Sequence, residues 1–272
     1  MAAVNMTEGG ITKHLADYSI PLILGNMFQL TYNAVDSIIA GRFIGKEALA
    51  AEGTASPVMN IVILGISGIC MGASVLMSEF YGAGKKEKLK REMSTTVIFG
   101  CCFSVMIATL GGFFSKPLLG ALGVPDEILG KAASYLSIIF LGAPFTYFYN
   151  AVSAALKSVG DSKTPLYFLM VAFVLNVVGD LYFIVRWNLG VSGGALATTL
   201  SQLLCTVLSL VVLEGKMRRM GMERNQKIFD KTEFGRMMRI ALPAALQQSV
   251  VSLGNVCVQM VTNSFGAAVM AG

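Results

Sequence analysis

Two acidic residues lie inside long apolar segments of the sequence, Asp36 in the first segment and Asp180 in the fifth. A carboxylate in the hydrocarbon of a membrane costs about 2.5–3.5 kcal/mol on insertion scales, so such residues are rare and usually functional. Asn176 lies one helical turn before Asp180 and shares its helix face. Thr198 lies in the next apolar segment. We call Asp36, Asn176, Asp180 and Thr198 the polar quartet; their oxygen atoms suit Na⁺ or the carriage of a proton.

The composition is that of a polytopic, all-α membrane protein. Of the 272 residues, 54% are hydrophobic and 14% are charged, whereas a soluble domain has about 25% charged residues. Repeated apolar runs of roughly 20 residues predict several membrane-spanning helices. The net charge of +5 does not indicate nucleic-acid binding, because the basic residues gather in the connections on one side.

Six spans are expected, and a seventh begins before the sequence ends. The spans cover about residues 17–41, 54–80, 93–115, 132–156, 164–187 and 191–213, and the seventh begins near 238. Pro21, Pro144 and Pro243 fall inside spans, where proline produces kinks. Pro57 and Pro165 are expected near helix starts.

The distribution of basic residues predicts the orientation. With the N-terminus in the cytoplasm, 16 of the 21 Lys and Arg residues lie inside. The five on the outside are Arg42, Lys46, Lys116, Lys131 and Arg186. This asymmetry favours a multi-pass protein of the plasma (inner) membrane with a cytoplasmic N-terminus. Depth along the helices, at 1.5 Å per residue, then places the polar quartet in the outer half of the membrane.

The end of the sequence resembles its beginning. Ile20-Pro21-Leu22 recurs as Leu242-Pro243-Ala244, and Phe43-Ile44-Gly45 recurs as Ser264-Phe265-Gly266, followed by Val269 and Ala271. Repeated bundles joined by a cytoplasmic linker are a common plan of transporters.

The repeat predicts three parts. They are a six-helix amino-terminal lobe at 1–213, a cytoplasmic linker at 214–237 and the start of a second lobe at 238–272. We therefore expect a twelve-helix, two-lobe protein that is truncated early in its second half.

Several short motifs occur in order along the chain. Pro21 is followed fifteen residues later by Asp36, and the later motifs are Gly41-Arg42-Phe43-Ile44-Gly45 with Ala48-Leu49-Ala50-Ala51, Tyr81-Gly82-Ala83-Gly84, Gly160-Asp161-Ser162-Lys163-Thr164-Pro165, Asn176 with Asp180, and the segment 190–199. Together, in this order and at these helix positions, they resemble the multidrug and toxic compound extrusion (MATE) transporters, from about Lys13 onward.

The resemblance implies an antiporter of two six-helix lobes that exports cationic or amphipathic drugs in exchange for Na⁺ or H⁺. It implies no cofactor other than the coupling ion, and its partners would be the lipid bilayer, the small organic cargo and the missing second lobe. The family's amino-lobe cation site maps onto the polar quartet. Polar cavity positions map onto Gln29, Tyr32, Asn150 and Ser153, and Pro21 matches the kink of the first helix.

Other functions remain as alternatives. A lipid-linked oligosaccharide flippase of the same superfamily would place basic residues in the cavity to meet pyrophosphate, whereas the charges within these spans are acidic and favour cationic cargo. A membrane-embedded enzyme would need a nucleophile pair, a metal cluster or a His/Glu dyad, and the spans contain none. In a purely structural interpretation, Asp36 faces a water-filled vestibule and Asp180 pairs with a neighbouring helix.

Overall fold

A computed structural model describes residues 11–122, 124, 126–221 and 229–264. The described residues are almost entirely helical. The helices are α1 (Ile11–Phe43), α2 (Lys46–Gly82), α3 (Lys86–Ala121), α4 (Asp126–Leu141), α5 (Ala143–Ser158), α6 (Lys163–Asp180), the π-helical segment η1 (Leu181–Arg186), α7 (Val191–Arg219) and α8 (Lys231–Ser264).

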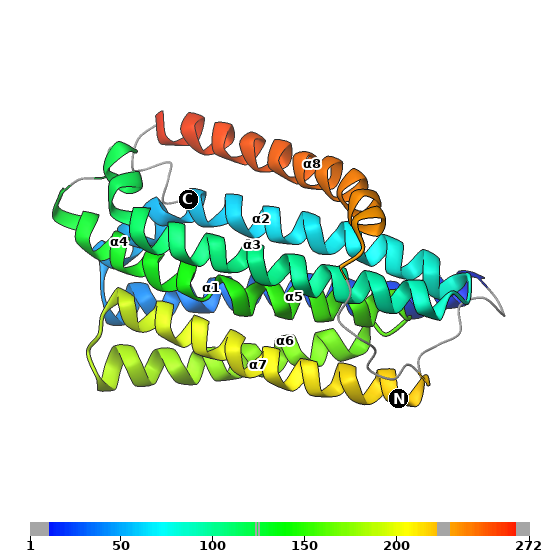
Figure 1. Cartoon of the computed structure of the whole chain (residues 1–272). Coiled ribbons are helices and arrows are strands. Elements are labelled where there is room, and N and C mark those ends of the chain that lie inside the picture. Colours follow the sequence, from blue (N-terminus) through cyan, green and yellow to red (C-terminus); the bar gives the residue numbers. More distant parts are fainter. Residues whose placement is uncertain (1–10, 123, 125, 222–228, 265–272) are drawn as a thin grey trace.

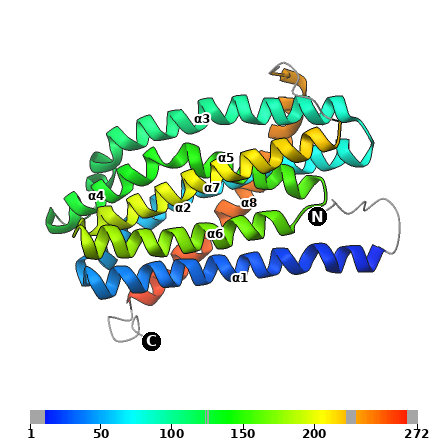
Figure 2. The same ribbon diagram turned by 90° about the horizontal axis from the view of Figure 1, so that it is seen from below.

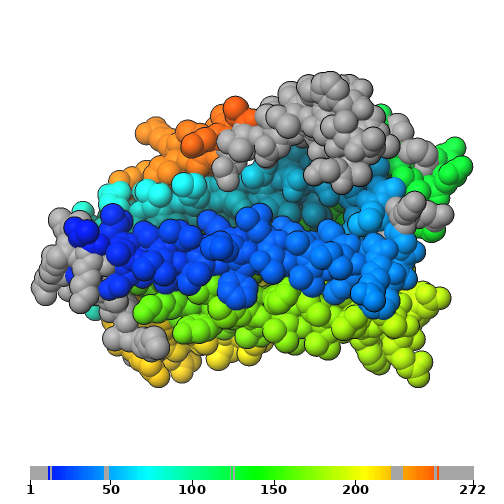
Figure 3. Space-filling model, turned by 180° about the vertical axis from the view of Figure 1, so that it is seen from behind, coloured from blue at the N-terminus to red at the C-terminus, as the bar shows by residue number. Residues whose placement is uncertain are grey.

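The helices lie side by side in an elongated bundle (Figures 1 and 2). α1 packs on α6, and α6 on α7, while α2 is central and contacts α3, α4, α5 and α8. α8 crosses the outside of the bundle over α2 (Figure 1). Seen from behind, α1 extends along the whole length of one face (Figure 3).

The helices confirm a multi-pass membrane protein, with one difference from expectation. Within the described part of the chain, four helices are long and apolar enough to cross a membrane: Leu49–Gly82, Lys86–Ala121, Lys163–Arg186 and Val191–Arg219. α4 with α5 makes a fifth span if the bent pair counts as one. α1 forms where the first span was predicted but does not reach this standard. Its middle carries Asn26, Gln29, Asn33 and Asp36, which lower its hydropathy.

The fourth predicted span, with its expected kink near Pro144, forms as two helices, α4 and α5, which together pass as one bent span. The chain bends by 45° between α4 and α5, with Gly142 at the break. Pro144 is therefore not inside a helix but at its start, where its missing N–H costs no hydrogen bond. Pro57 was predicted near a helix start but lies inside a helix, because α2 begins at Lys46, well before the predicted start.

Proline also lies inside the helices at the two ends of the chain. α1 continues through Pro21, and α8 continues through Pro243, as the predicted repeat implies. The second part of that repeat, Phe265, Gly266, Val269 and Ala271, lies outside the described residues. α7 continues to Arg219, six residues into the predicted linker.

Basic residues gather at one end of the bundle, where α1 begins, α2 and α3 are connected and α7 ends (Figure 1). Lys216 near the end of α7 forms an ion pair with Asp161, which precedes α6. The Asp161 side chain also accepts a hydrogen bond from the Thr164 backbone N–H at 3.0 Å and so binds a free donor in the first turn of α6. This end corresponds to the basic side predicted from the sequence.

Small residues allow two pairs of helices to approach closely. A Cβ added to Gly100 of α3 would lie 1.7 Å from the Tyr147 ring of α5. A Cβ added to Gly68 or Gly72 of α2 would lie 2.5 or 2.7 Å from the Cβ of Ala245 or Ala241 of α8. Glycine and alanine four residues apart on facing helices are a common basis of close packing in membranes. The α2–α8 crossing is therefore backbone against backbone.

Candidate functional site

Asp180 is the last residue of α6 and has no exposed surface. Its carboxylate lies against α7, where a Cβ on Gly194 would be 3.8 Å from the Oδ1 atom. Among the described residues, no group donates a hydrogen bond to either of its carboxylate oxygens. The helix changes to π geometry at the next residue, and such π segments are frequent at functional sites.

Asp36 of α1 brings a second carboxyl group to this position. It is half-buried, and its side chain lies beside that of Asp180. Two ionised carboxylates offer each other only acceptors and repel each other, and burial removes the water that would screen them. This arrangement is stable only with a proton or a cation between or on the two groups.

Asn176 and Thr198 complete the polar quartet on α6 and α7. The Asn176 Nδ2 group donates a hydrogen bond to Thr198 Oγ1 at 3.1 Å. Asn176 is 1% exposed, and its Oδ1 atom accepts no hydrogen bond from the described residues. The structure thus brings the four residues together, with three buried acceptor oxygens that have no donor: two on Asp180 and one on Asn176.

Tyr32, predicted as a cavity residue, belongs to this site. Its buried side chain interacts with Thr198, Asp36 and Asp180, and its ring packs on Phe173 with the ring centroids 6.0 Å apart. Among the described residues its hydroxyl has no hydrogen-bond partner, although a phenol hydroxyl can donate to a carboxylate. Tyr32 therefore brings another polar group of α1 to the residues of α6 and α7.

Two further residues of the site were missed in the sequence. Glu52 of α2 is half-buried and interacts electrostatically with Asp36 and Asp180, and its charge also acts on the buried Tyr135 of α4. Asp36 lies seven residues before Phe43 at the end of α1, and Glu52 lies six residues after the start of α2. At 1.5 Å per residue, both carboxyl groups are roughly 10 Å from the same end. The apolar residues 48–51 before Glu52 were the signal that the helix begins earlier.

The other predicted cavity residues lie apart. Gln29 is exposed and donates a hydrogen bond to Asn33 on the same helix. Asn150 donates to the Thr146 carbonyl of its own helix at 2.8 Å, and Ser153 is buried. These last two are on α5, whose contact with α1 includes the hydrogen bond from the Tyr18 hydroxyl to the Lys157 carbonyl at 3.2 Å.

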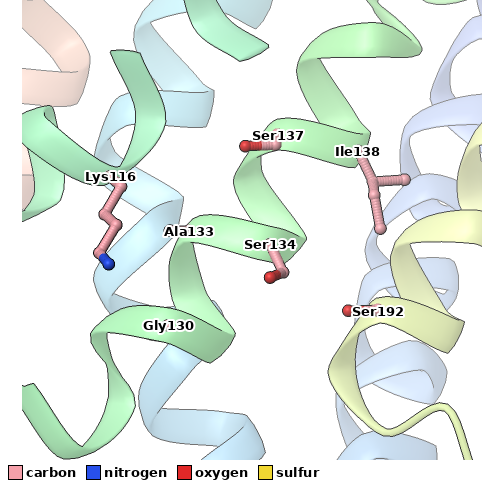
Figure 4. Close-up of a pocket in the computed structure, with 7 residues that line it drawn as sticks. All are labelled: Lys116, Gly130, Ala133, Ser134, Ser137, Ile138 and Ser192. Atoms are coloured by element: carbon pink, nitrogen blue, oxygen red, sulfur yellow. The ribbon is translucent and has the colours of Figure 1, made fainter. Parts of the chain in front are cut away.

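An open pocket of about 600 Å³ lies elsewhere, between α3, α4 and α7 (Figure 4). Lys116, Ser134, Ser137 and Ser192 are its polar lining residues. None of the predicted cavity residues lines it. The described residues contain no group of three or more His, Cys, Asp or Glu side chains arranged to hold a metal ion. A cation at the polar quartet would therefore depend on the Asn176 and Thr198 oxygens as well as on carboxylates.

The fold and its buried acidic residues define a multi-pass helical membrane protein with a polar site inside the bundle. A protein-family model described as MatE matches residues 21–182, which is more than half of the chain. The chain belongs to the MATE family of transporters.

Curated relatives and solved structures agree with this assignment. The probable multidrug resistance protein YpnP of Bacillus subtilis (strain 168) is 31% identical over 273 residues, which cover 100% of this chain and 61% of the relative. The FAD transporter of Shewanella oneidensis is 26% identical and covers 90% of this chain and 55% of the relative. A crystal structure of MATE in the straight conformation matches with a TM-score of 0.88 and 25% identity, over 98% of this chain and 59% of that chain. The chain spans about three fifths of the length of YpnP and of the MATE chain.

Proposed function

We propose that this chain supplies the first lobe of an antiporter, which exports cationic or amphipathic drugs in exchange for Na⁺ or H⁺. The coupling ion would bind at the polar quartet, between α1, α6 and α7. The observation that carries the proposal is the buried Asp180 carboxylate, whose oxygens have no donor among the described residues and which lies beside Asp36. A buried charge of this kind needs a compensating proton or cation.

The same two carboxylates explain how ion and cargo would exclude each other. Without a bound ion, Asp36 and Asp180 make the interior of the lobe negative, and a negative interior attracts organic cations. A Na⁺ ion or a proton arriving from the outer side reduces the negative charge of the site and weakens that attraction. Ion binding therefore favours release of the cargo on the outside.

The orientation and division of the chain are part of the proposal. The N-terminus would lie in the cytoplasm and the basic end of the bundle would face inward, at the plasma membrane. Residues 1–213 would form the lobe, 214–237 the linker, and the segment from 238 the start of a second lobe. The greater length of the relatives supports a second bundle in the working protein.

The direct test measures transport of a fluorescent organic cation by membrane vesicles that contain the protein encoded by the complete reading frame of this chain. Export appears as release from right-side-out vesicles and as uptake into inverted ones. We expect transport to follow an imposed Na⁺ or H⁺ gradient and to stop when both gradients are collapsed. Separate gradients identify the coupling ion. Export that continues unchanged without either gradient contradicts the proposal.

Glu52 provides a graded test of the same site. Because Glu52 interacts with both aspartates without belonging to the quartet, its negative charge should help to attract the ion. We expect Glu52→Gln to lower the apparent affinity for the coupling ion by about threefold to tenfold, equivalent to roughly 0.7–1.4 kcal/mol. Titration of transport against Na⁺ and pH measures the change.

Glu79→Gln is the matched control for Glu52→Gln, because Glu79 is exposed near the opposite end of the same helix. It should leave the ion titration unchanged. An equal loss of affinity in both variants would mean that Glu52 acts only through the general charge of the protein.

A further inference from the structure

Glu92 is a second buried acidic side chain, far from the polar quartet. It lies six residues after the start of α3 and has no exposed surface. Within the described residues, neither of its carboxylate oxygens has a hydrogen-bond partner. Thr96, one turn further, donates its hydroxyl to the Glu92 backbone carbonyl at 2.9 Å.

The first turns of α8 cover Glu92. Met237, which is fully buried, accepts a hydrogen bond from the Thr96 hydroxyl at its Sδ atom, 3.8 Å away. Asp230 and Glu233, just before and within α8, add negative charge near Glu92, and Arg236 adds positive charge. From α5, Tyr147 lies nearby and donates its hydroxyl to the Thr96 carbonyl at 3.0 Å.

The basic residues around Glu92 pair with other acids. Ion pairs join Lys88 to Glu233 at 3.5 Å and Arg91 to Asp230 at 3.7 Å. Arg236 pairs with Glu233 at 3.4 Å and with Glu79 of α2 at 3.5 Å. These contacts tie the start of α8 to α2 and α3, and among the described residues they leave the Glu92 carboxyl near two acids and without an ion pair of its own.

We propose that Glu92 is a proton-binding site that holds the start of α8 against α3. A carboxylic acid can be buried here, whereas an unpaired carboxylate carries the full penalty of desolvation and the repulsion of Asp230 and Glu233. Loss of the proton therefore favours separation of α8 from α3, and separation lets water reach Glu92.

The surrounding groups favour a proton over a metal ion. An alkali or alkaline-earth ion needs several oxygen ligands. The Thr96 hydroxyl is directed at backbone and sulfur acceptors, and Thr95 Oγ1 accepts the Asp230 backbone N–H at 3.1 Å. The carboxylates of Asp230 and Glu233 already pair with basic side chains. Met237 beside Thr96 presents a thioether, which is a poor ligand for such ions.

This site is separate from the polar quartet. Glu92 is six residues from the basic end of the bundle along α3, and Asp180 is seventeen residues from that end along α6. At 1.5 Å per residue, the two carboxyl groups differ by on the order of 15 Å along the bundle. The proton at Glu92 therefore concerns the attachment of α8 and does not depend on which ion drives transport.

The test measures amide hydrogen exchange of residues 230–241 in the 272-residue chain in lipid nanodiscs at pH 6 and pH 9, corrected for intrinsic exchange. In the wild type, we expect protection of this segment to fall about tenfold or more over this range. Glu92→Gln, which remains neutral, should keep the segment protected at both pH values. A wild type without pH dependence, or a Glu92→Gln variant that keeps it, overturns the proposal.

Two controls make the result specific. Glu87→Gln changes an exposed acid of the same helix that pairs with Lys90 at 3.0 Å, and it should behave as the wild type. If Glu92→Gln does not fold, infrared difference spectra of the Asp36→Asn, Asp180→Asn double variant, which keeps Glu92, take its place. We expect a protonated-carboxyl band that disappears as the pH rises, in parallel with the loss of protection. Absence of this band overturns the proposal. At pH 9, replacing a bulky organic cation in the buffer by Na⁺ should not restore the protection of residues 230–241. Restored protection would assign the site to a metal ion instead of a proton.

Discussion

Asp180→Asn is expected to remove the dependence of export on the ion gradient. Asparagine has nearly the same shape but no charge, so the fully buried position at the end of α6 remains filled. Loss of a charged partner in a buried contact costs about 1.5–3 kcal/mol, equivalent to a roughly 10- to 100-fold weaker apparent affinity for the ion. The measurement is gradient-driven export from vesicles, with Na⁺ and pH varied separately.

The matched control for Asp180→Asn is Asp17→Asn. Asp17 is an exposed acid on α1, near the basic end of the bundle. It should export as the wild type does. Asp36→Asn should reproduce most of the Asp180→Asn loss, because the two side chains interact directly. If both quartet variants retain ion-dependent export, the polar quartet is not the coupling site.

Gly100→Ala is expected to lower the free energy of unfolding by several kcal/mol, because the methyl group meets a buried ring. The added methyl group would lie 1.7 Å from the Tyr147 Cε1 atom, and Tyr147 is fully buried with its hydroxyl bonded to the Thr96 carbonyl at 3.0 Å. Overpacking costs about 1–3 kcal/mol, and loss of the hydrogen bond adds about 1 kcal/mol. Thermal unfolding followed by circular dichroism in detergent measures the loss.

Gly120→Ala on the same helix is the control for Gly100→Ala. A Cβ at Gly120 meets nothing within 4 Å, and alanine is favoured over glycine within a helix by roughly 0.5–1 kcal/mol. This variant should therefore be as stable as the wild type or slightly more stable. Equal stability of the two alanine variants would show that the ring of Tyr147 moves aside without cost.

Much of the candidate site was predictable because charge in an apolar segment is a strong signal. Asp36 and Asp180 stand out for that reason, and helical periodicity places Asn176 beside Asp180. The Asn176–Thr198 hydrogen bond follows from two neighbouring antiparallel helices. Glu52 was missed because it lies near a predicted helix boundary, and boundaries depend on capping and tertiary contacts that apolar patterns do not encode.

A kink near Pro144 was predicted, but the complete helix break at Gly142 and the burial of Glu92 were not predictable in the same way. Pro144 signals a kink or a helix start equally well. Which of the two forms depends on how α4 and α5 pack against α2, α3 and α7, and apolar patterns do not encode that packing. Glu92 falls at the edge of a predicted span, where acids are normally exposed to water. It is buried because α8, more than a hundred residues later, lies over it.

The close crossing of α2 and α8 restricts which side chains can replace those at the contact. Where Gly68 and Gly72 meet Ala245 and Ala241, the backbones leave no room for a larger side chain. In hydrocarbon, the attraction between such surfaces comes from close contact rather than from exclusion of water. Selection at these four positions therefore acts on volume more than on polarity, so a serine is more acceptable there than a leucine, although leucine is the more lipid-soluble residue.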